Sequence, residues 1–373
     1  MNFFDLKTIN AEYTDELKQA ASEVIDSGRY IRGERVVKFE NELCNYIGCK
    51  YTVGTGNGLD ALRLIFRAYI ELGVMKPGDE VILPANTFIA TMIAVTDNGL
   101  KPVITDIDPH TMNLDISKAE KAITEKTKAI IPVHLYGNCC WNEQLKNIAI
   151  SHNIKIVEDN AQAIGAKAET AGLNGGFMSG NLGNAAATSF YPIKNLGALG
   201  DAGAVTTNDI SLAQTVRALG NYGEMQKYRH KYIGINSRLD EIQAAFLSVK
   251  LKYLERENTL RAAIAQTYNA NILVRQITKP ELHVNRQSVW HQYIIRTENR
   301  DELKNHLAEN GIETMIHYPT PLHKHEAYLK YENLSFPTAE KEAKRILSLP
   351  INPSIKEDTA ITIAQIINTF YEG

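Results

Sequence analysis

The sequence predicts an α/β fold, with a large domain built on a mainly parallel sheet and a smaller α+β domain after it. The first observation is a regular alternation of strand-like and helix-like stretches from Tyr51 to Asp159. Such alternation places helices on both faces of a parallel sheet. The second observation is that this alternation is lost beyond Arg256. The third is the length of 373 residues, which suffices for one large and one smaller domain.

The predicted large domain begins with two amphipathic helices, over residues 14–26 and 36–47. The alternating region then predicts strands over residues 51–55, 80–84, 102–107, 128–135 and 155–159, separated by helices within residues 56–72, 87–99, 117–123 and 142–152. A further strand is expected from Ala185 to Tyr191. Two more helices are expected, one from residue 210 that stops at Gly220 and one over residues 240–253. The apolar stripe of the last helix indicates core or interface; it consists of Ile242, Ala245, Phe246, Val249 and Tyr253.

The second half of the chain predicts a different arrangement. A strand is expected over residues 291–297 and a helix over 300–311, followed by a strand over 312–323 that enters a proline-bounded turn and by helices over 338–348 and 356–371. We therefore predict an N-terminal arm and large domain over residues 1–249, and a small domain over residues 250–373.

Composition and charge exclude several classes of protein. A formal net charge of −3 argues against a general nucleic-acid surface, which needs a basic excess. The four cysteines show no repeated C-x-x-C pairing, which weighs against a zinc site and a disulfide framework. No signal region and no apolar run near eighteen residues is found, so we expect a cytoplasmic protein without a membrane span.

Two strand ends carry groups of opposite charge. Asp159 ends the run 154–159, and Lys194 follows the run that ends at Tyr191. Ligands of open parallel sheets bind beyond the carboxyl ends of strands, and pyridoxal phosphate needs a lysine amine and an acid opposite its pyridine nitrogen. Ser189 offers a hydroxyl for the phosphate. Taken singly, the lysine is also typical of a solvated loop and the acid of a helix cap, and spacing alone does not show that they meet.

Two further segments are suited to anions. The turn Gly54 to Ala61 lies between a strand and a helix, where free N–H groups and the helix dipole favour a phosphate. It lacks the G-x-G-x-x-G spacing and the acid after the next strand, so it favours a phosphate over NAD, with an empty tight turn as the alternative. The second segment, residues 227–232, is a basic and aromatic loop in a chain of net negative charge.

The chain resembles the nucleotide-sugar aminotransferases of the DegT/StrS type, which are fold type I pyridoxal phosphate enzymes. The resemblance extends over nearly the whole length, through the ordered blocks SGRYIRGERVVKFE, GNGLDAL, PGDEVILPANTFIAT, PVHLYGN, VEDNAQAIGA, SFYPIKNLGALGDAGAV, GINSRLDEIQAA and IHYPTPLH. It implies a seven-stranded type of sheet, pyridoxal 5'-phosphate as the cofactor, and L-glutamate and a nucleotide-linked keto sugar as substrates.

The resemblance also implies roles for individual residues. Lys194 matches the Schiff-base lysine, which moves a proton between substrate and cofactor, and Asp159 matches the partner of the pyridine nitrogen. The other residues implied to hold the cofactor are Gly58 and Leu59 through backbone N–H groups, Phe88 by stacking, Gln162 on the ring hydroxyl side, Ser189 through its hydroxyl, and Asn236 from the other subunit. The role of Asn236 implies a homodimer with shared active sites. Leu59 stands where many members have threonine, so phosphate binding there depends on backbone groups.

The blocks GNGLDAL and YRHKYIGINSRLDEIQAA are most similar to those of members that aminate carbon 3 of dTDP-3-oxo-6-deoxyhexoses. We expect transfer from L-glutamate to such a sugar of glucose or galactose configuration, for a deoxyaminosugar of a surface polysaccharide, O-antigen or S-layer glycan. The residues expected to contact the nucleotide sugar are Tyr222, His230, Lys231, His317, Tyr318 and His323. For His317 and His323, packing within a loop is the alternative.

Three other functions stay open at this point. One is amination of carbon 4 of a dTDP- or UDP-4-oxo-6-deoxy sugar by the same cofactor residues. Another is a non-catalytic regulator or scaffold, which has no chemical need for Lys194, Asp159 and Ser189 together. The third is a nicotinamide oxidoreductase, which the missing dinucleotide fingerprint disfavours.

Overall fold

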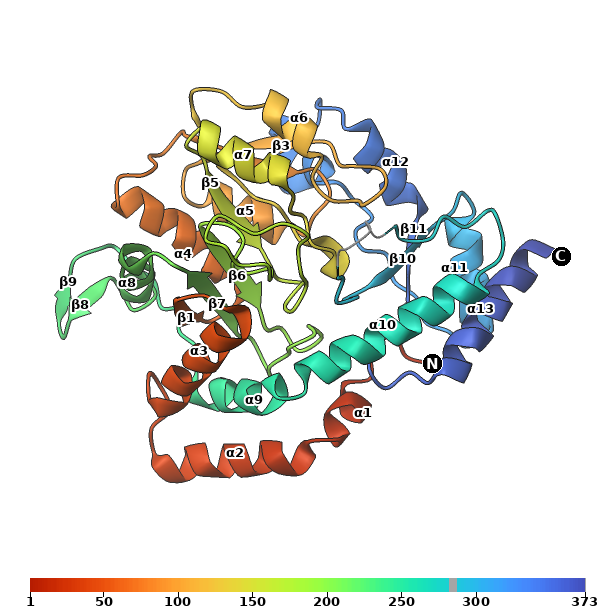
Figure 1. Ribbon diagram of the computed structural model, residues 1–373, viewed down its shortest axis with the longest axis horizontal. Helices are drawn as coiled ribbons and strands as arrows, with labels where there is room; N and C mark the ends of the chain where they lie inside the picture. Colours follow the sequence, from red (N-terminus) through yellow and green to blue (C-terminus); the bar gives the residue numbers. More distant parts are fainter. Residues whose placement is uncertain (282–286, 373) are drawn as a thin grey trace.

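The computed structural model describes residues 1–281 and 287–372 and contains a central seven-stranded sheet (Figure 1). The sheet has the strand order β1-β7-β6-β5-β4-β2-β3. Its strands are β1 (Tyr51–Thr55), β2 (Glu80–Pro84), β3 (Lys101–Thr105), β4 (Thr127–Ile130), β5 (Lys155–Asp159), β6 (Ala185–Ser189) and β7 (Gly203–Thr207). The predicted α/β class and mainly parallel sheet are confirmed.

One strand runs against the others. β7 pairs in antiparallel fashion with both β1 and β6, whereas the pairs from β6 through β5, β4 and β2 to β3 are parallel. β1 therefore runs in the same direction as β6, and the carboxyl ends of all strands except β7 lie at one edge of the sheet. The loop between β6 and β7 starts at this edge and carries Lys194.

Helices cover both faces of the sheet. All of β2 is buried, and its successive residues point to opposite faces: Val81 and Leu83 belong to one apolar cluster, and Ile82 to another. The first cluster contains residues of α4 (Gly58–Glu71), α5 (Ala90–Thr96) and α8 (Ile210–Leu219), and the second contains residues of α6 (Ile116–Lys121) and α7 (Glu143–Ser151). β2 is apolar from Val81 to Pro84 because neither of its faces meets water.

The N-terminal helices pack beside the sheet domain. α1 (Leu6–Ala11), α2 (Thr14–Ser27) and α3 (Glu34–Ile47) precede β1, and α2 and α3 both contact α9 (Glu241–Leu251). The stripe predicted for the helix over residues 240–253 is confirmed as core. Ala245, Phe246 and Val249 are buried against α2, with Ile242 and Tyr253 partly buried beside them.

The C-terminal part has an apolar core of its own. α10 (Leu254–Asn271), α11 (Arg300–Glu309) and α13 (Glu357–Glu372) surround the antiparallel pair β10 (Tyr293–Arg296) and β11 (Ile346–Leu349), and α12 (Pro337–Arg345) leads into β11. Figure 1 shows α10 extending from α9 to this part of the molecule. The separate core favours the division into residues 1–249 and 250–373, which stays a prediction.

Three expectations for secondary structure were wrong. The helix expected over residues 338–348 ends at Arg345, because Ile346 to Leu349 pair with the distant β10 and are buried. No strand lies within residues 312–323; Met315 alone forms a bridge to Ser348, and the prolines lead into a short 3-10 helix, Leu322–Lys324. The basic loop contains a small hairpin, β8 (Glu224–Gln226) and β9 (Arg229–His230), which projects from the body beyond α8 (Figure 1).

No helix among the described residues combines the length and the apolar character that crossing a membrane requires.

A buried carboxylate anchors the segment before β6. Glu158 is fully buried, and its two oxygens accept hydrogen bonds from the backbone N–H groups of Gly180, Leu182 and Gly183 at 2.7–2.8 Å. His134 Nε2 lies 2.8 Å from Glu158 Oε2. Because the Cys140 N–H donates to Nδ1 of His134, the proton is on Nε2 and the imidazole donates to Glu158.

Replacing Glu158 by Ala should strongly destabilise the fold. Each buried donor left without an acceptor costs about 1–3 kcal/mol, so we expect the free energy of unfolding to fall by at least about 3 kcal/mol. Urea unfolding followed by circular dichroism measures the change. The control Glu309→Ala removes an exposed carboxylate, and its midpoint should stay close to that of the wild type. Equal midpoints for both variants would contradict the anchoring role.

Candidate functional site

A pocket of about 520 Å³ lies at the common carboxyl edge of the strands. Loops after β1, β2, β4, β5 and β6 contribute to it, together with residues from the C-terminal part of the chain. The lining residues are Asn57, Gly58, Leu59, Leu62, Thr87, Phe88, Ala90, Val133, Asp159, Ala161, Gln162, Ser189, Tyr191, Ile193, Lys194, Asp201, His291, Gln292, His317 and Tyr318. The sequence predicted ligand binding at this edge of the sheet, and the pocket has that position.

Asp159 is held in place at the end of β5. Its Oδ2 accepts a hydrogen bond of 2.7 Å from the Thr91 hydroxyl, and its Oδ1 accepts one of 3.2 Å from the Ala161 N–H. The Thr91 hydroxyl also lies 3.0 Å from that of Thr87. Because Asp159 is buried and held on both oxygens, its carboxylate has a fixed orientation in the pocket.

Lys194 shares the pocket with Asp159. It lies in a turn after β6, where its N–H donates to the Tyr191 carbonyl at 2.8 Å. Burial lowers the pKa of the Lys194 amine to about 8, and the negative charge of Asp159 acts in the opposite direction. An amine with this pKa has a substantial neutral fraction near physiological pH, which a nucleophile and proton carrier needs.

A cradle for an anion lies at the start of α4. The Asn57 side chain caps this helix by accepting the Asp60 N–H at 2.8 Å, and Gly58 and Leu59 follow as its first residues. Ser189 touches this turn so closely that a Cβ on Gly58 would lie 2.6 Å from the Ser189 Cβ. Only glycine permits this contact, which brings helix N–H groups and a hydroxyl to one point, as a phosphate requires.

Aromatic side chains form one wall of the pocket. The rings of Phe88 and Tyr318 lie 5.6 Å apart, and Gln162 Nε2 donates to the Tyr318 hydroxyl at 3.0 Å. Gln162 Oε1 accepts the Tyr136 N–H at 2.7 Å, and the Tyr136 hydroxyl donates to the His317 carbonyl. The backbone of the C-terminal part is thereby attached to Tyr136 in the loop after β4, and the Tyr318 side chain to Gln162 in the loop after β5.

The histidines of the pocket are uncharged at neutral pH. Burial and the positive charge of Lys194 lower the pKa of His317 to about 4, and its Nδ1 lies 2.8 Å from the Ser348 hydroxyl. The same two causes hold the pKa of His291 well below its usual value. The pocket therefore keeps Lys194 and Asp159 as its principal pair of opposite charges.

The tautomer of His291 is determined by its neighbours. Asn195 Nδ2 donates to the Asn258 side chain and to the Val289 carbonyl, both at 2.8 Å. Asn195 Oδ1 is therefore the acceptor for His291 Nδ1 at 3.1 Å, which leaves Nε2 of this pocket-lining residue with its lone pair.

Most of the expected site residues lie in the pocket. The pocket brings together Gly58, Leu59, Phe88, Asp159, Gln162, Ser189, Lys194, His317 and Tyr318. Tyr222, His230, Lys231 and Asn236 lie on the segment around the β8–β9 hairpin and do not line it. His323 also lies outside the pocket: it is fully buried, with Nε2 2.9 Å from Glu340 Oε1 and its ring against Phe336.

The sequence reasoning missed several residues of the pocket. They are Asn57, Thr87, Tyr191, Asp201, His291 and Gln292. Asn57, Thr87, Tyr191 and Asp201 lie within blocks already singled out, so their place in these blocks was a signal. His291 and Gln292 begin a predicted strand in the C-terminal part, and only the folding of that part onto the sheet brings them to the pocket.

The donor set of the pocket fits pyridoxal phosphate. The cradle at Gly58 and Ser189 suits its phosphate, the Asp159 carboxylate suits a protonated ring nitrogen, and the Lys194 amine suits its aldehyde carbon. The Phe88 ring, 54% exposed at the pocket wall, offers a surface for a flat ring.

Comparison with known proteins agrees with this chemistry. The DegT/DnrJ/EryC1/StrS aminotransferase family matches residues 11–368. The chain is 45% identical over 368 residues to the dTDP-3-amino-3,6-dideoxy-alpha-D-galactopyranose transaminase of Aneurinibacillus thermoaerophilus, with 99% of each chain covered. It is 41% identical over 360 residues to the UDP-2-acetamido-2-deoxy-3-oxo-D-glucuronate aminotransferase of Pseudomonas aeruginosa, covering 96% of this chain and 97% of the relative. The solved structure of S. venezuelae DesV in complex with a ketimine intermediate is similar, with a TM-score of 0.94, 41% identity, and coverage of 100% and 98%.

Titration of Lys194 tests the electrostatics of the pocket. In cofactor-free protein, acylation of Lys194 followed by mass spectrometry should rise with pH around a midpoint near 8. Asp159→Asn removes the charge that favours the ammonium form, so this midpoint should move to lower pH.

Lys250 is the matched control for this titration, since burial lowers its pKa to about 8 as well and its acidic neighbour is Glu257. Its midpoint should not respond to Asp159→Asn. A Lys194 midpoint near the ordinary lysine value of about 10.4 would contradict the desolvated amine.

Proposed function

The chain belongs to the DegT/DnrJ/EryC1/StrS aminotransferase family and is a pyridoxal-phosphate-dependent nucleotide-sugar aminotransferase, and we propose that it transfers an amino group from L-glutamate to carbon 3 of a dTDP-3-oxo-6-deoxyhexose. The observation that carries the transfer of an amino group is that Lys194 and Asp159 line one pocket beside the cradle of Gly58 and Ser189. The sugar product would serve the synthesis of a surface glycan.

Both named relatives support carbon 3 as the position of amination. One is named for a 3-amino sugar linked to dTDP, and the other for a 3-oxo sugar linked to UDP. The two relatives are named for sugars linked to different nucleotides, yet both names specify carbon 3. This favours the 3-oxo substrate over the carbon-4 alternative. The higher identity to the dTDP relative, 45% against 41%, favours dTDP.

Bound pyridoxal phosphate supplies the electron sink that makes the carbon beside the amino group acidic. Lys194 Nζ is positioned to take and return the proton at that carbon, since its lowered pKa permits both states. Asp159, oriented by Thr91 and Ala161, would hold a proton on the ring nitrogen. The N–H groups of Gly58 and Leu59 and the Ser189 hydroxyl would bind the phosphate, and the Phe88 ring would cover one face of the site.

We assign the sugar to the side of the pocket lined by His317 and Tyr318. His317 is neutral at working pH and Tyr318 keeps its proton, because burial and the Asp159 charge raise its pKa. Neutral donors and acceptors of this kind bind sugar hydroxyls without competing for the Lys194 proton.

The proposal includes a homodimer with shared sites. Asn236, and Tyr222, His230 and Lys231 in and around the hairpin, do not line their own pocket. The same segment exposes large apolar side chains, with Tyr228 81% and Ile233 86% exposed. A second copy of the chain would cover these side chains and receive Asn236 at its cofactor phosphate.

The first experiment follows the visible absorption band of the bound cofactor during sequential additions. L-glutamate should abolish the band, and a dTDP-3-oxo-6-deoxy sugar should restore it, while a dTDP-4-oxo sugar should not. Recovery with the 4-oxo sugar alone would select the carbon-4 alternative. A band unchanged by glutamate would refute glutamate as the donor.

Subunit mixing tests the shared site. Lys194→Ala and Asn236→Ala homodimers should each be inactive or severely impaired. After the two are mixed and allowed to exchange subunits, a heterodimer contains one site with both Lys194 and Asn236, so activity should return to at most half of the wild-type value per heterodimer. No recovery despite subunit exchange seen by native mass spectrometry would contradict sharing.

A further inference from the structure

Two cysteines meet at the end of α3. The helix ends at Ile47, and Gly48 follows with a left-handed backbone at φ 81°, which glycine adopts without strain. The Gly48 N–H donates to the Cys44 carbonyl at 2.8 Å, so the chain turns back on the last turn of the helix. The side chain of Cys49 is thereby returned to that of Cys44.

The two thiols are within contact distance. Cys49 Sγ lies 3.7 Å from Cys44 Sγ, and both face the hydroxyl of Thr52, at 3.9 and 3.1 Å respectively. Disulfide formation therefore requires the sulfur atoms to approach by less than 2 Å, since an S–S bond is about 2.05 Å long. Rotation of two side chains at a helix end supplies movement of this size.

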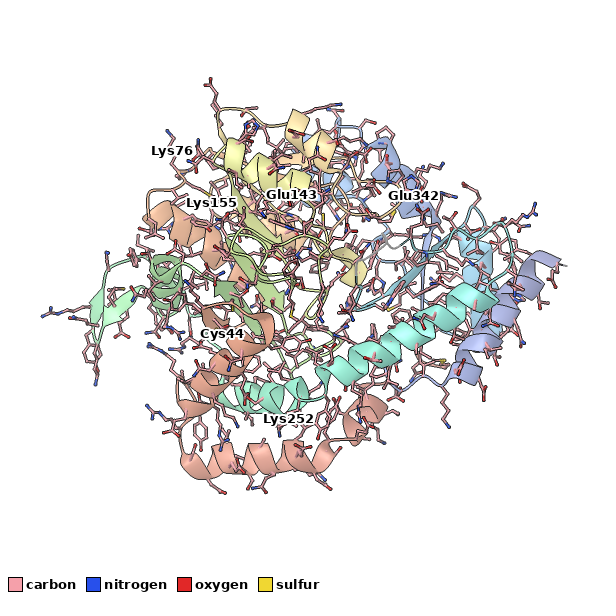
Figure 2. The ribbon with its side chains drawn as sticks, in the orientation of Figure 1. Cys44, Lys76, Glu143, Lys155, Lys252 and Glu342 are labelled. Carbon is pink, nitrogen blue, oxygen red and sulfur yellow. The ribbon has the colours of Figure 1, made fainter. Side chains whose placement is uncertain are left out.

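The thiols of Cys44 and Cys49 differ in their accessibility to small reagents. Cys44, labelled in Figure 2, lines a surface pocket of about 260 Å³ together with Lys50 and Arg217. Cys49 does not line it. The pocket therefore offers Cys44 to a small reagent. Arg217 is paired with Glu40, which also lines the pocket, at 2.8 Å, so the exposed Lys50 is the basic side chain suited to a carboxylate on that reagent.

We propose that Cys44 and Cys49 form a redox-active dithiol that small anionic disulfides convert to a reversible intramolecular disulfide. The Cys44 thiolate attacks one sulfur of the small disulfide, forming a mixed disulfide and releasing one small thiolate. Cys49 then loses its proton to solvent, and its thiolate attacks the Cys44 sulfur and releases the second small thiolate. Two protein thiols are oxidised and one small disulfide is reduced to two thiols.

The acidities of the thiols agree with this order. The hydrogen bond from Cys49 lowers the pKa of Cys44 to about 7, against the opposing effect of burial. The same contact and burial raise the pKa of Cys49 above its usual value. Cys44 is thus the attacking thiol and Cys49 the resolving one.

Neither cysteine lines the cofactor pocket, so the readout is the sulfur chemistry itself. Folded, cofactor-loaded protein is incubated with oxidised glutathione, its remaining thiols are alkylated, and it is cleaved with trypsin. Cleavage after Lys38 and Lys50 releases one peptide that contains both cysteines. In the wild type this peptide should escape alkylation and be lighter than the dithiol form of the peptide by two hydrogen atoms. Treatment with dithiothreitol should restore the mass of the dithiol form.

Single variants distinguish the two thiols. Cys49→Ser should accumulate a mixed disulfide with glutathione on Cys44, and Cys44→Ser should lower the rate of thiol loss in this peptide at least about tenfold. Cys44→Ala serves the same purpose if the serine variant does not fold. Cys139→Ser is the matched control, because Cys139 is buried, and it should leave the oxidation unchanged. A peptide whose thiols stay reduced, or a Cys44→Ser protein that reacts as fast as the wild type, would overturn the proposal.

Discussion

The buried carboxylate of Glu158 is the interaction on which the geometry of the site depends. It holds the N–H groups of Gly180, Leu182 and Gly183, and these residues immediately precede β6, the strand that delivers Ser189 and Lys194. Its neighbour Asp159 reaches the pocket, because successive side chains of a strand point to opposite sides. The adjacent residues Glu158 and Asp159 thus supply the buried anchor of the segment before β6 and the acid of the pocket.

The pocket concentrates charge on few groups. Burial lowers the pKa of Lys194 to about 8, and burial together with the positive charge of this lysine lowers the pKa of His291 and His317, which stay uncharged. Asp159 is the buried counter-charge, stabilised by the Thr91 hydroxyl and a backbone N–H. An electrostatic arrangement of this kind favours proton transfer by one amine, since the pKa values of the pocket histidines lie well below the working pH.

Tertiary contacts decide the parts of the site that come from the C-terminal half. His317 and Tyr318 reach the pocket because the Tyr136 and Gln162 side chains bond to them. Beside them, His291 is bonded to Asn195, and the Gln292 N–H donates to the Tyr136 carbonyl. The strand β11 that supports the segment around His317 was expected to be helical, since its pairing partner β10 lies about fifty residues away in the chain. Local pattern carries no information about such a partner.

The sequence by itself determined the α/β class and the sheet edge at which ligands bind, and it singled out Asp159, Ser189, Lys194 and the turn from Gly54 to Ala61, because strand periodicity and strand ends are local properties of the chain. Only the tertiary structure decided that these residues meet in one pocket, that β7 runs against its neighbours, and that His323 is buried beside Glu340. It also decided that Cys44 and Cys49, which show no motif in the sequence, lie in contact. These outcomes depend on packing between distant segments, which burial of apolar surface selects and local propensity does not specify.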